Sequence, residues 1–129
     1  MATRVREKAI QRKENADKRP SAYLPNVKIS VSKVRLVLDQ VRGKNAQEAL
    51  AILTYMPNAA APIVKKLIAS AMANAEVKGM DKDALKVAEI YCTQSRVYNK
   101  KLNVRGRGRA DVIVKRGSHI TVILDQVQA

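Results

Sequence analysis

The sequence predicts an α+β fold in which three helices are followed by one long β-hairpin that projects from a small body. The first observation is the spacing of the apolar residues, which is helical between residues 32 and 79 and alternates in residues 87–93 and 119–124. The second is the run VRGRGRAD, Val104 to Asp111, which places two glycines between the alternating segments. A hairpin that turns around these glycines follows from the two observations.

The length of the chain predicts a single domain, and the distribution of charge predicts basic extensions from it. The chain has 129 residues, enough for one domain with one modest core. Its formal net charge is +14. Residues 45–95 hold five basic and five acidic side chains, whereas residues 96–116 hold eight basic side chains against Asp111 alone. Such a distribution favours a polyanionic partner such as nucleic acid.

The first 22 residues are expected to form a basic tail. They lack periodic apolar positions, and Arg19-Pro20 closes them off. A tail of this composition is mobile or is ordered by RNA, with some helix within residues 6–19. Residues 23–129 are expected to form a single domain, in which Val27–Ser30 would be a short edge strand.

The first predicted helix of the body runs from Ser32 to Arg42. Its apolar residues recur at helical spacing and form one face: Val34, Val37, Leu38 and Val41. Gly43 ends the helix. The basic residues that fall off the apolar face can stay outside the core: Lys33, Arg35 and Arg42.

Two more helices follow. The second begins after Asn45, a suitable N-cap whose spacing to Glu48 resembles a capping box, and it ends before Pro57. The third begins near Ala60 and continues to Gly79. Its alanine-rich face would let another element approach closely.

Beyond residue 84 the apolar period changes to two. One strand groups Ala88, Ile90 and Cys92 on one side, and a later strand groups Ile120, Val122 and Leu124. The two strands are expected to form a hairpin at about residues 85–124. Strands of about 12 residues reach roughly 40 Å, about twice the usual length. A body this small cannot cover them, so the end of the hairpin should project.

Catalysis is not expected. His119 is the only histidine and Cys92 the only cysteine, so a disulfide within the chain and a zinc site of several Cys and His are excluded. Ser118 beside His119 is a chain neighbour rather than a triad, although a small hydrolase using this pair is one alternative. The sequence contains no nucleotide-binding motif, and no cofactor, metal or small-molecule substrate is expected. The lone cysteine fits a reducing cytoplasm, and no segment is expected to enter a membrane.

The basic residues around the glycines indicate phosphate binding. Arginine contacts phosphate in a planar, bidentate manner, and glycine lets the backbone approach a polyanion. A solvated, flexible loop is the alternative for a short RGRGR run. Four tyrosines without Phe or Trp make a poor base-stacking platform, so recognition should rest on phosphates. The candidate residues are Arg96, Lys100, Lys101, Arg105, Arg107, Arg109, Lys115 and Arg116.

Three segments carry a resemblance to a known family: VKISVSKVRLVLDQVRGKNAQEALAIL, KKLIASAMANAE and RGRGRADVIVKRGSHITVIL. In this order, from Val27 to Leu124, they closely resemble the bacterial large-subunit ribosomal protein family L-twenty-two. The resemblance implies three helices packed on a small antiparallel sheet with a long protruding β-hairpin. It also implies a structural constituent of the large ribosomal subunit that binds ribosomal RNA and lines the polypeptide exit tunnel with the hairpin tip.

Carried over by position, the resemblance places the tip at about Asn99–Arg109. The tunnel-lining residues would be Asn99, Lys100, Lys101, Leu102, Asn103, Val104, Arg105, Gly106 and Arg107. It adds Lys33, Arg35, Ser118 and His119 to the eight basic residues above as contacts with ribosomal RNA. The implied partners are large-subunit ribosomal RNA, neighbouring large-subunit proteins and the nascent chain.

The chain departs from the family pattern at Ser30-Val31-Ser32-Lys33, where many members carry Ser-Pro-Arg-Lys before the first helix. One basic contact is therefore missing. The tail of about 22 residues is longer than in the shortest members, and its role is open. The alternative to the ribosomal interpretation is a free-standing architectural protein that binds DNA or RNA away from ribosomes.

Overall fold

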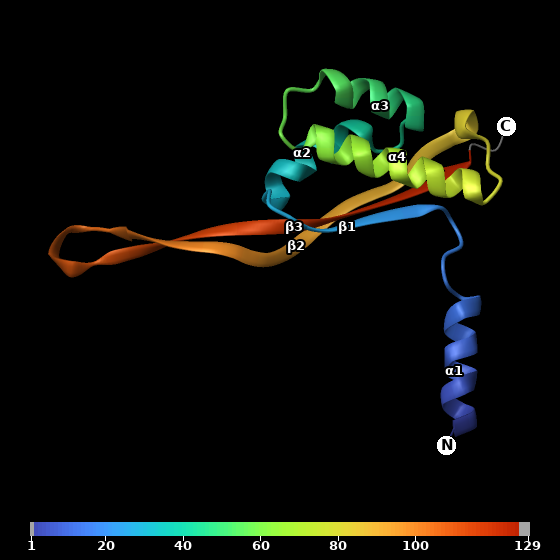
Figure 1. Cartoon of the computed structure of the whole chain (residues 1–129), viewed down its shortest axis with the longest axis horizontal. Helices are drawn as coiled ribbons and strands as arrows, with labels where there is room; N and C mark the ends of the chain where they lie inside the picture. Colours follow the sequence, from blue (N-terminus) through green and yellow to red (C-terminus); the bar gives the residue numbers. More distant parts are fainter. Residues whose placement is uncertain (1, 127–129) are drawn as a thin grey trace.

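The computed structural model describes residues 2–126, with side chains from residue 3 on. It confirms the α+β fold: helices cover one face of a three-stranded antiparallel sheet, and two strands continue beyond the body as a hairpin (Figure 1). Met1 of the expected tail and residues 127–129 of the expected domain lie outside the described residues.

The sheet has the strand order β1-β3-β2. Its strands are β1 (Ser21–Val27), β2 (Leu85–Val104) and β3 (Ala110–Gln126). The edge strand therefore ends at Val27, where the predicted strand Val27–Ser30 would begin. Pairing with β3 buries Ala22 and Val27 of β1, which explains the position. Pro25 is tolerated because the outer side of an edge strand needs no donor.

The three predicted helices of the body are present. They are α2 (Val31–Val41), α3 (Ala46–Tyr55) and α4 (Ala61–Val77). The apolar face predicted for α2 is fully buried. Asn45 is the N-cap of α3, but its side chain makes no capping hydrogen bond, and Glu48 pairs with Lys44 at 3.0 Å. The capping-box prediction was therefore wrong. Within residues 2–126 no helix is long and apolar enough to cross a membrane.

The core lies between these helices and one face of the sheet. On β3 the predicted alternation holds, with Ile120, Val122 and Leu124 buried. On β2 a register shift between Val87 and Glu89 interrupts the regular alternation, so that different residues of the strand face the core. Val87 is therefore buried together with Ile90 and Cys92, while Ala88, which the sequence grouped with them, is only half-buried.

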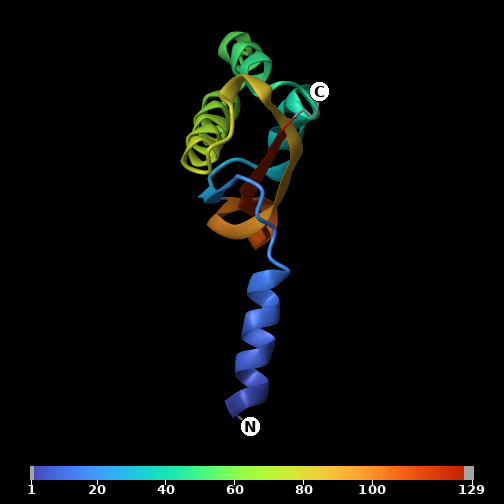
Figure 2. The same cartoon turned by 90° about the vertical axis from the view of Figure 1, so that its right-hand side faces the viewer.

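The N-terminal segment is helical. Residues Ala2–Glu14 form a continuous helix, α1, where the sequence indicated a tail with some helix. The segment contains no glycine or proline and is rich in Ala, Arg, Lys, Glu and Gln, which favour helices. The side chains from Thr3 to Glu14 are all exposed. Figures 1 and 2 show α1 standing away from the body.

The linker between α1 and β1 is held on the body. Arg19 pairs with Asp17 at 2.6 Å and with Glu89 of β2 at 2.8 Å. The Lys78 ammonium at the end of α4 donates to the carbonyls of Lys18 and Arg19 at 2.7 and 3.1 Å. Pro20 is buried. These contacts fix the point at which α1 leaves the body.

Acid is expected to release the Asp17–Arg19 contact. Side-chain hydrogen bonds from Arg19 lower the pKa of Asp17 to about 2. Because this pKa lies below that of the unfolded chain, the contribution of the contact is complete above about pH 4 and is lost as the pH falls through about 2. The Arg19 amide donates to Asp17 Oδ1 at 2.9 Å, so its NMR shift should titrate with a midpoint near that pKa. A midpoint at the ordinary aspartate value would contradict the contact.

Candidate nucleic-acid interface

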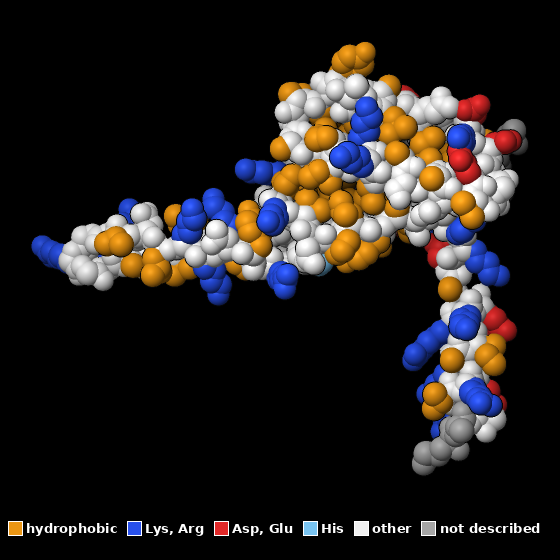
Figure 3. All heavy atoms as spheres, in the orientation of Figure 1, with side chains coloured by type: hydrophobic (Ala, Val, Ile, Leu, Met, Phe, Trp, Pro, Cys, Tyr) orange, Lys and Arg blue, Asp and Glu red, His pale blue; other side chains and the backbone are white. Residues whose placement is uncertain are grey.

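The hairpin carries most of the candidate residues far from the core. Strands β2 and β3 pair from Leu85↔Gln126 out to Val104↔Ala110, and residues 98–113 are all exposed. Basic side chains are spread along the projecting ribbon, as Figure 3 shows. The exposed set includes Arg96, Lys100, Lys101, Arg105, Arg107, Arg109, Lys115 and Arg116. The outer hairpin therefore offers side chains to a partner and adds none to the core.

The outer ribbon has two different faces. The cross-strand pairs Leu102↔Val112 and Val104↔Ala110 lie on one face, because side chains alternate along each strand. The pairs Lys101↔Ile113 and Asn103↔Asp111 lie on the other face. Sequence reasoning concentrated on the charges and missed the apolar face. The alternation of Leu102 and Val104 with polar residues was the signal for it.

The turn occupies Arg105–Arg109, the outer part of the expected tip at residues 99–109, whose remainder is strand. Arg107 and Gly108 have positive φ angles of 57° and 73°, as in the tight turns that join twisted strands. The Arg105 amide donates to the Arg109 carbonyl at 2.8 Å and closes the turn. The Arg105 side chain pairs with Asp111 at 2.6 Å, so one of the three tip arginines already has an acidic partner. Arg107 projects from the turn itself.

Replacing Gly108 by alanine is expected to loosen the tip. A Cβ at Gly108 has open space, so the cost of about 1 kcal/mol comes from the positive φ. Exchange of the Arg105 amide should become about fivefold faster. Gly106→Ala is the matched control, because Gly106 has open space and no positive φ. Equal exchange in both variants would contradict this description of the turn.

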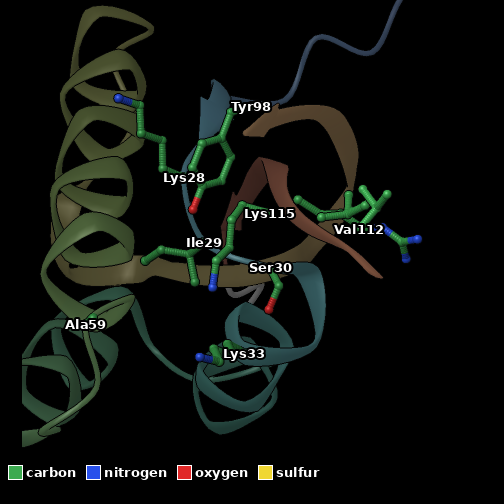
Figure 4. A pocket seen from close by; sticks show the side chains of 10 residues that line it. Lys28, Ile29, Ser30, Lys33, Ala59, Tyr98, Val112 and Lys115 are labelled. Atoms are coloured by element: carbon green, nitrogen blue, oxygen red, sulfur yellow. The ribbon is translucent and has the colours of Figure 1, made fainter. Parts of the chain in front are cut away.

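A basic groove lies where the hairpin leaves the body. It brings Lys33 of α2 together with Lys115 and Arg116 of β3, and Figure 4 shows Lys28, Lys33 and Lys115 around it. Lys28 was missed by sequence reasoning, although it stands just before α2. Tyr98 from β2 also lines the groove. The candidate Lys33 therefore meets Lys115 and Arg116 at one surface, although it lies far from them in the sequence.

Arg35 lies in an adjoining hollow. Its other lining residues are Ser30, Val31, Ser32, Gln94 and Arg116, so the first turn of α2 faces the same space. The amino end of a helix attracts anions, since its first amides lack partners within the helix and its dipole is positive there. Arg35 and Arg116 add two formal charges. The hollow and the basic groove together form a surface that suits phosphate groups.

Two candidates, Ser118 and His119, lie at least partly inside the body. Ser118 is fully buried, so the expectation that its side chain contacts RNA is corrected. Its hydroxyl has no hydrogen-bond partner among the described residues. His119 is half-buried, accepts a hydrogen bond from the Asn26 amide at Nδ1 (3.1 Å) and stacks on Tyr23. It therefore holds the end of β1, where Asn26 has a φ of 55° and also accepts from Ser95.

The arrangement does not assemble a catalytic centre from these candidates. Ser118 and His119 are consecutive on β3, so their side chains point to opposite faces of the sheet. The Cys92 thiol is buried, and desolvation raises its pKa, which disfavours the reactive thiolate. Among the described residues, no three His, Cys, Asp or Glu side chains gather as a metal site.

A small body carries a long basic ribbon and a basic groove, an arrangement that suits contact with a polyanion. Comparison with known families agrees: the model described as "Ribosomal protein L22p/L17e" matches residues 22–125, and the chain belongs to this family. Its members are structural proteins of the ribosome and not enzymes, which removes the hydrolase alternative.

The names of individual relatives support the same family assignment. The chain is 46% identical over 120 residues to "Large ribosomal subunit protein uL22" of Agathobacter rectalis, covering 90% of this chain and 91% of that protein. It is 48% identical over 120 residues to the protein of the same name from Lachnospira eligens, with coverages of 91% and 93%. The same name belongs to a Desulforamulus reducens protein, 48% identical over 99 residues, 76% of this chain and 87% of that protein.

Proposed function

We propose that this protein is a structural constituent of the large ribosomal subunit in the bacterial cytoplasm, where it binds ribosomal RNA, supports assembly and lines the polypeptide exit tunnel with its hairpin tip. One observation carries the proposal: residues 98–113 extend the ribbon beyond the body, are exposed throughout and hold five basic side chains against Asp111. A folded chain gains no core stability from such a ribbon. A polyanion that surrounds the ribbon would account for its length and its positive charge.

The proposal divides the surface by role. Arginines and lysines of the ribbon and the basic groove neutralise phosphates of ribosomal RNA. Neighbouring large-subunit proteins and the nascent chain are the other partners. The tip residues 99–107 face the tunnel, and the exposed side chains of Leu102 and Val104 add an uncharged patch to this otherwise basic wall.

Sedimentation tests the ribosomal role directly. Tagged protein expressed in bacteria should migrate with large subunits and remain there through washes of increasing salt. Release at moderate salt, with equal binding to duplex DNA and to ribosomal RNA, would support the free-standing architectural protein instead.

Crosslinking tests the tunnel role separately. A photo-crosslinking side chain at Leu102 should capture nascent chains on stalled ribosomes, whereas one at the body residue Tyr55 should not. Both positions are strongly exposed, with 71% and 88% of their surface accessible, so a difference in crosslinking would not come from burial of the probe. If the Leu102 probe captures no nascent chain on ribosomes that contain the protein, the tunnel assignment is wrong.

Replacing Asp111 by asparagine is expected to strengthen RNA binding. The change removes the only acidic residue of the outer hairpin and frees Arg105 from its 2.6 Å ion pair. One extra phosphate contact makes the logarithmic salt dependence of binding steeper by about 0.7–0.9. The measurement is affinity for ribosomal RNA between low and high salt. An unchanged slope would mean that Arg105 does not contact phosphate in the complex.

A further inference from the structure

Helix α1 (Ala2–Glu14) has a basic side and an acidic side. At 3.6 residues per turn, residues four and eight apart share one row, as do residues seven apart. The first row contains Arg4, Lys8 and Arg12, and the second contains Arg6 and Lys13. Val5 and Ala9 lie between the rows, whereas Glu7 and Glu14 lie on the opposite side. We call the surface of the two rows the basic face of α1.

The basic face has no function within the fold. The described side chains of α1 are all exposed, and the helix stands clear of the core (Figure 2). An isolated helix shorter than about 12–15 residues is marginal in water, so packing or binding must supply most of its stability. The family match begins at residue 22, so α1 also lies outside the part of the chain that defines the family.

The linker points α1 away from the hairpin. Arg19 and Lys78 hold residues 17–19 against the body, and the Leu124 amide donates to the Pro20 carbonyl at 2.9 Å. Figure 1 shows α1 and the hairpin leaving the body in different directions. On a large partner, α1 would therefore contact a different part of the partner from the part that the hairpin tip contacts.

We propose that α1 is a second RNA-binding element, whose basic face lies along the phosphate backbones that border a groove of double-helical RNA and whose helix is stabilised by this binding. The inference shares the RNA partner of the proposed function but uses none of the hairpin residues. Two rows of cations match two rows of phosphates, and the small side chains of Val5 and Ala9 let the helix approach. The carboxylates of Glu7 and Glu14 point away from the RNA.

Charge and composition favour RNA over an acidic protein. Protein interfaces are usually anchored by large apolar or aromatic side chains at their centre. The basic face offers only Val5 and Ala9 there, and the larger Ile10 lies towards the acidic side. Five cations around a centre of only two small apolar side chains are better suited to phosphates. Attachment at two separate points would also raise the effective concentration of each site for its RNA segment.

Substitutions in the full-length chain test this proposal. The variant Arg4→Gln/Lys8→Gln/Arg12→Gln removes the first row. The variant Lys65→Gln/Lys66→Gln/Lys86→Gln makes the same change in net charge on the body. The probe is a mixed-sequence RNA duplex of about 16 base pairs, a length that a duplex-binding domain spans, titrated over a range of salt.

The first-row variant should reduce the salt slope by about 2 and weaken binding about tenfold or more at 0.1 M salt, whereas the body variant should stay within about threefold of the parent chain. Ala9→Pro keeps every charge but breaks the helix, and it should also weaken binding. Far-UV circular dichroism should show helix gained by the parent chain on adding the duplex.

Each failure has a distinct meaning. If the first-row and Ala9→Pro variants bind the duplex like the parent chain, the α1 proposal is overturned, while binding through the hairpin can still be measured. If the first-row variant keeps its RNA affinity but is lost from assembled subunits, α1 binds a protein, and the RNA assignment is also overturned. Equal losses in the first-row and body variants would show a non-specific effect of charge and reject the site.

Discussion

Shortening the hairpin is expected to leave the body folded while greatly weakening RNA binding. The variant replaces Lys101–Ile113 by Asn-Gly, so that the paired residues Lys100 and Val114 flank a two-residue turn. The deleted residues are all exposed and none belongs to the core. The thermal unfolding midpoint should therefore change little.

The affinity of the shortened protein should fall steeply because four cations and one carboxylate leave with the hairpin end. The deleted cations are Lys101, Arg105, Arg107 and Arg109. Because Arg105 is paired with Asp111, about three phosphate contacts are lost, which lowers the salt slope by roughly 2–3 and the affinity for ribosomal RNA at 0.1 M salt by about 100-fold or more. The measurement is a salt titration of binding beside the parent chain.

A body that unfolds on shortening would contradict the division between body and ribbon. Full RNA affinity in the folded, shortened protein would contradict the role of the tip. A second variant that changes Leu102 and Val112 to threonine keeps the ribbon and its charges. It should retain the salt slope, because these side chains contact no phosphate in the proposed complex.

Replacing Gly117 by alanine is expected to be the most destabilising single change among the glycines. A Cβ there would lie 2.8 Å from the Val27 carbonyl oxygen of β1 and 3.5 Å from the Ser95 side chain. The oxygen belongs to backbone, so β1 or β3 must shift. Such overpacking costs about 1–3 kcal/mol, which corresponds to a fall of roughly 10 °C in the midpoint for a domain of this size.

The measurement is thermal and urea unfolding of Gly117→Ala, with Gly106→Ala as the control. A Cβ at Gly106 would have open space around it, so the Gly106→Ala variant should stay within about 0.5 kcal/mol of the parent chain. The Asn26–Ser95 hydrogen bond, beside the displaced strand end, should weaken as well. Equal midpoints for the two variants would show that β1 does not pass so close to β3 in solution.

Local pattern was sufficient for much of the fold. The helical spacing from Val34 to Val41 predicted the buried face of α2, and the alternation from Ile120 to Leu124 predicted the buried face of β3. The glycines between two alternating segments predicted the projecting hairpin. These predictions succeeded because each depends on residues close together in the chain.

Other features depend on pairing between distant segments. The register shift at Val87–Glu89 changes which residues of β2 face the core, and it depends on partners in β3 more than 30 positions away. The edge strand was placed too late because its pairing with β3, rather than its own alternation, decides its bounds. Ser118 was assigned to the RNA surface by the family resemblance, but its side chain is fully buried in the folded body.

The sequence by itself therefore determined the class of fold, the basic ribbon and the family, because charge, composition and local period are properties of the chain. The tertiary structure decided which charges act together. It joins Lys28 and Lys33 to Lys115 and Arg116 in one groove, pairs Arg105 with Asp111 and separates α1 from the hairpin. The reason is geometric: strand register and helix packing set distances between residues that no local pattern relates.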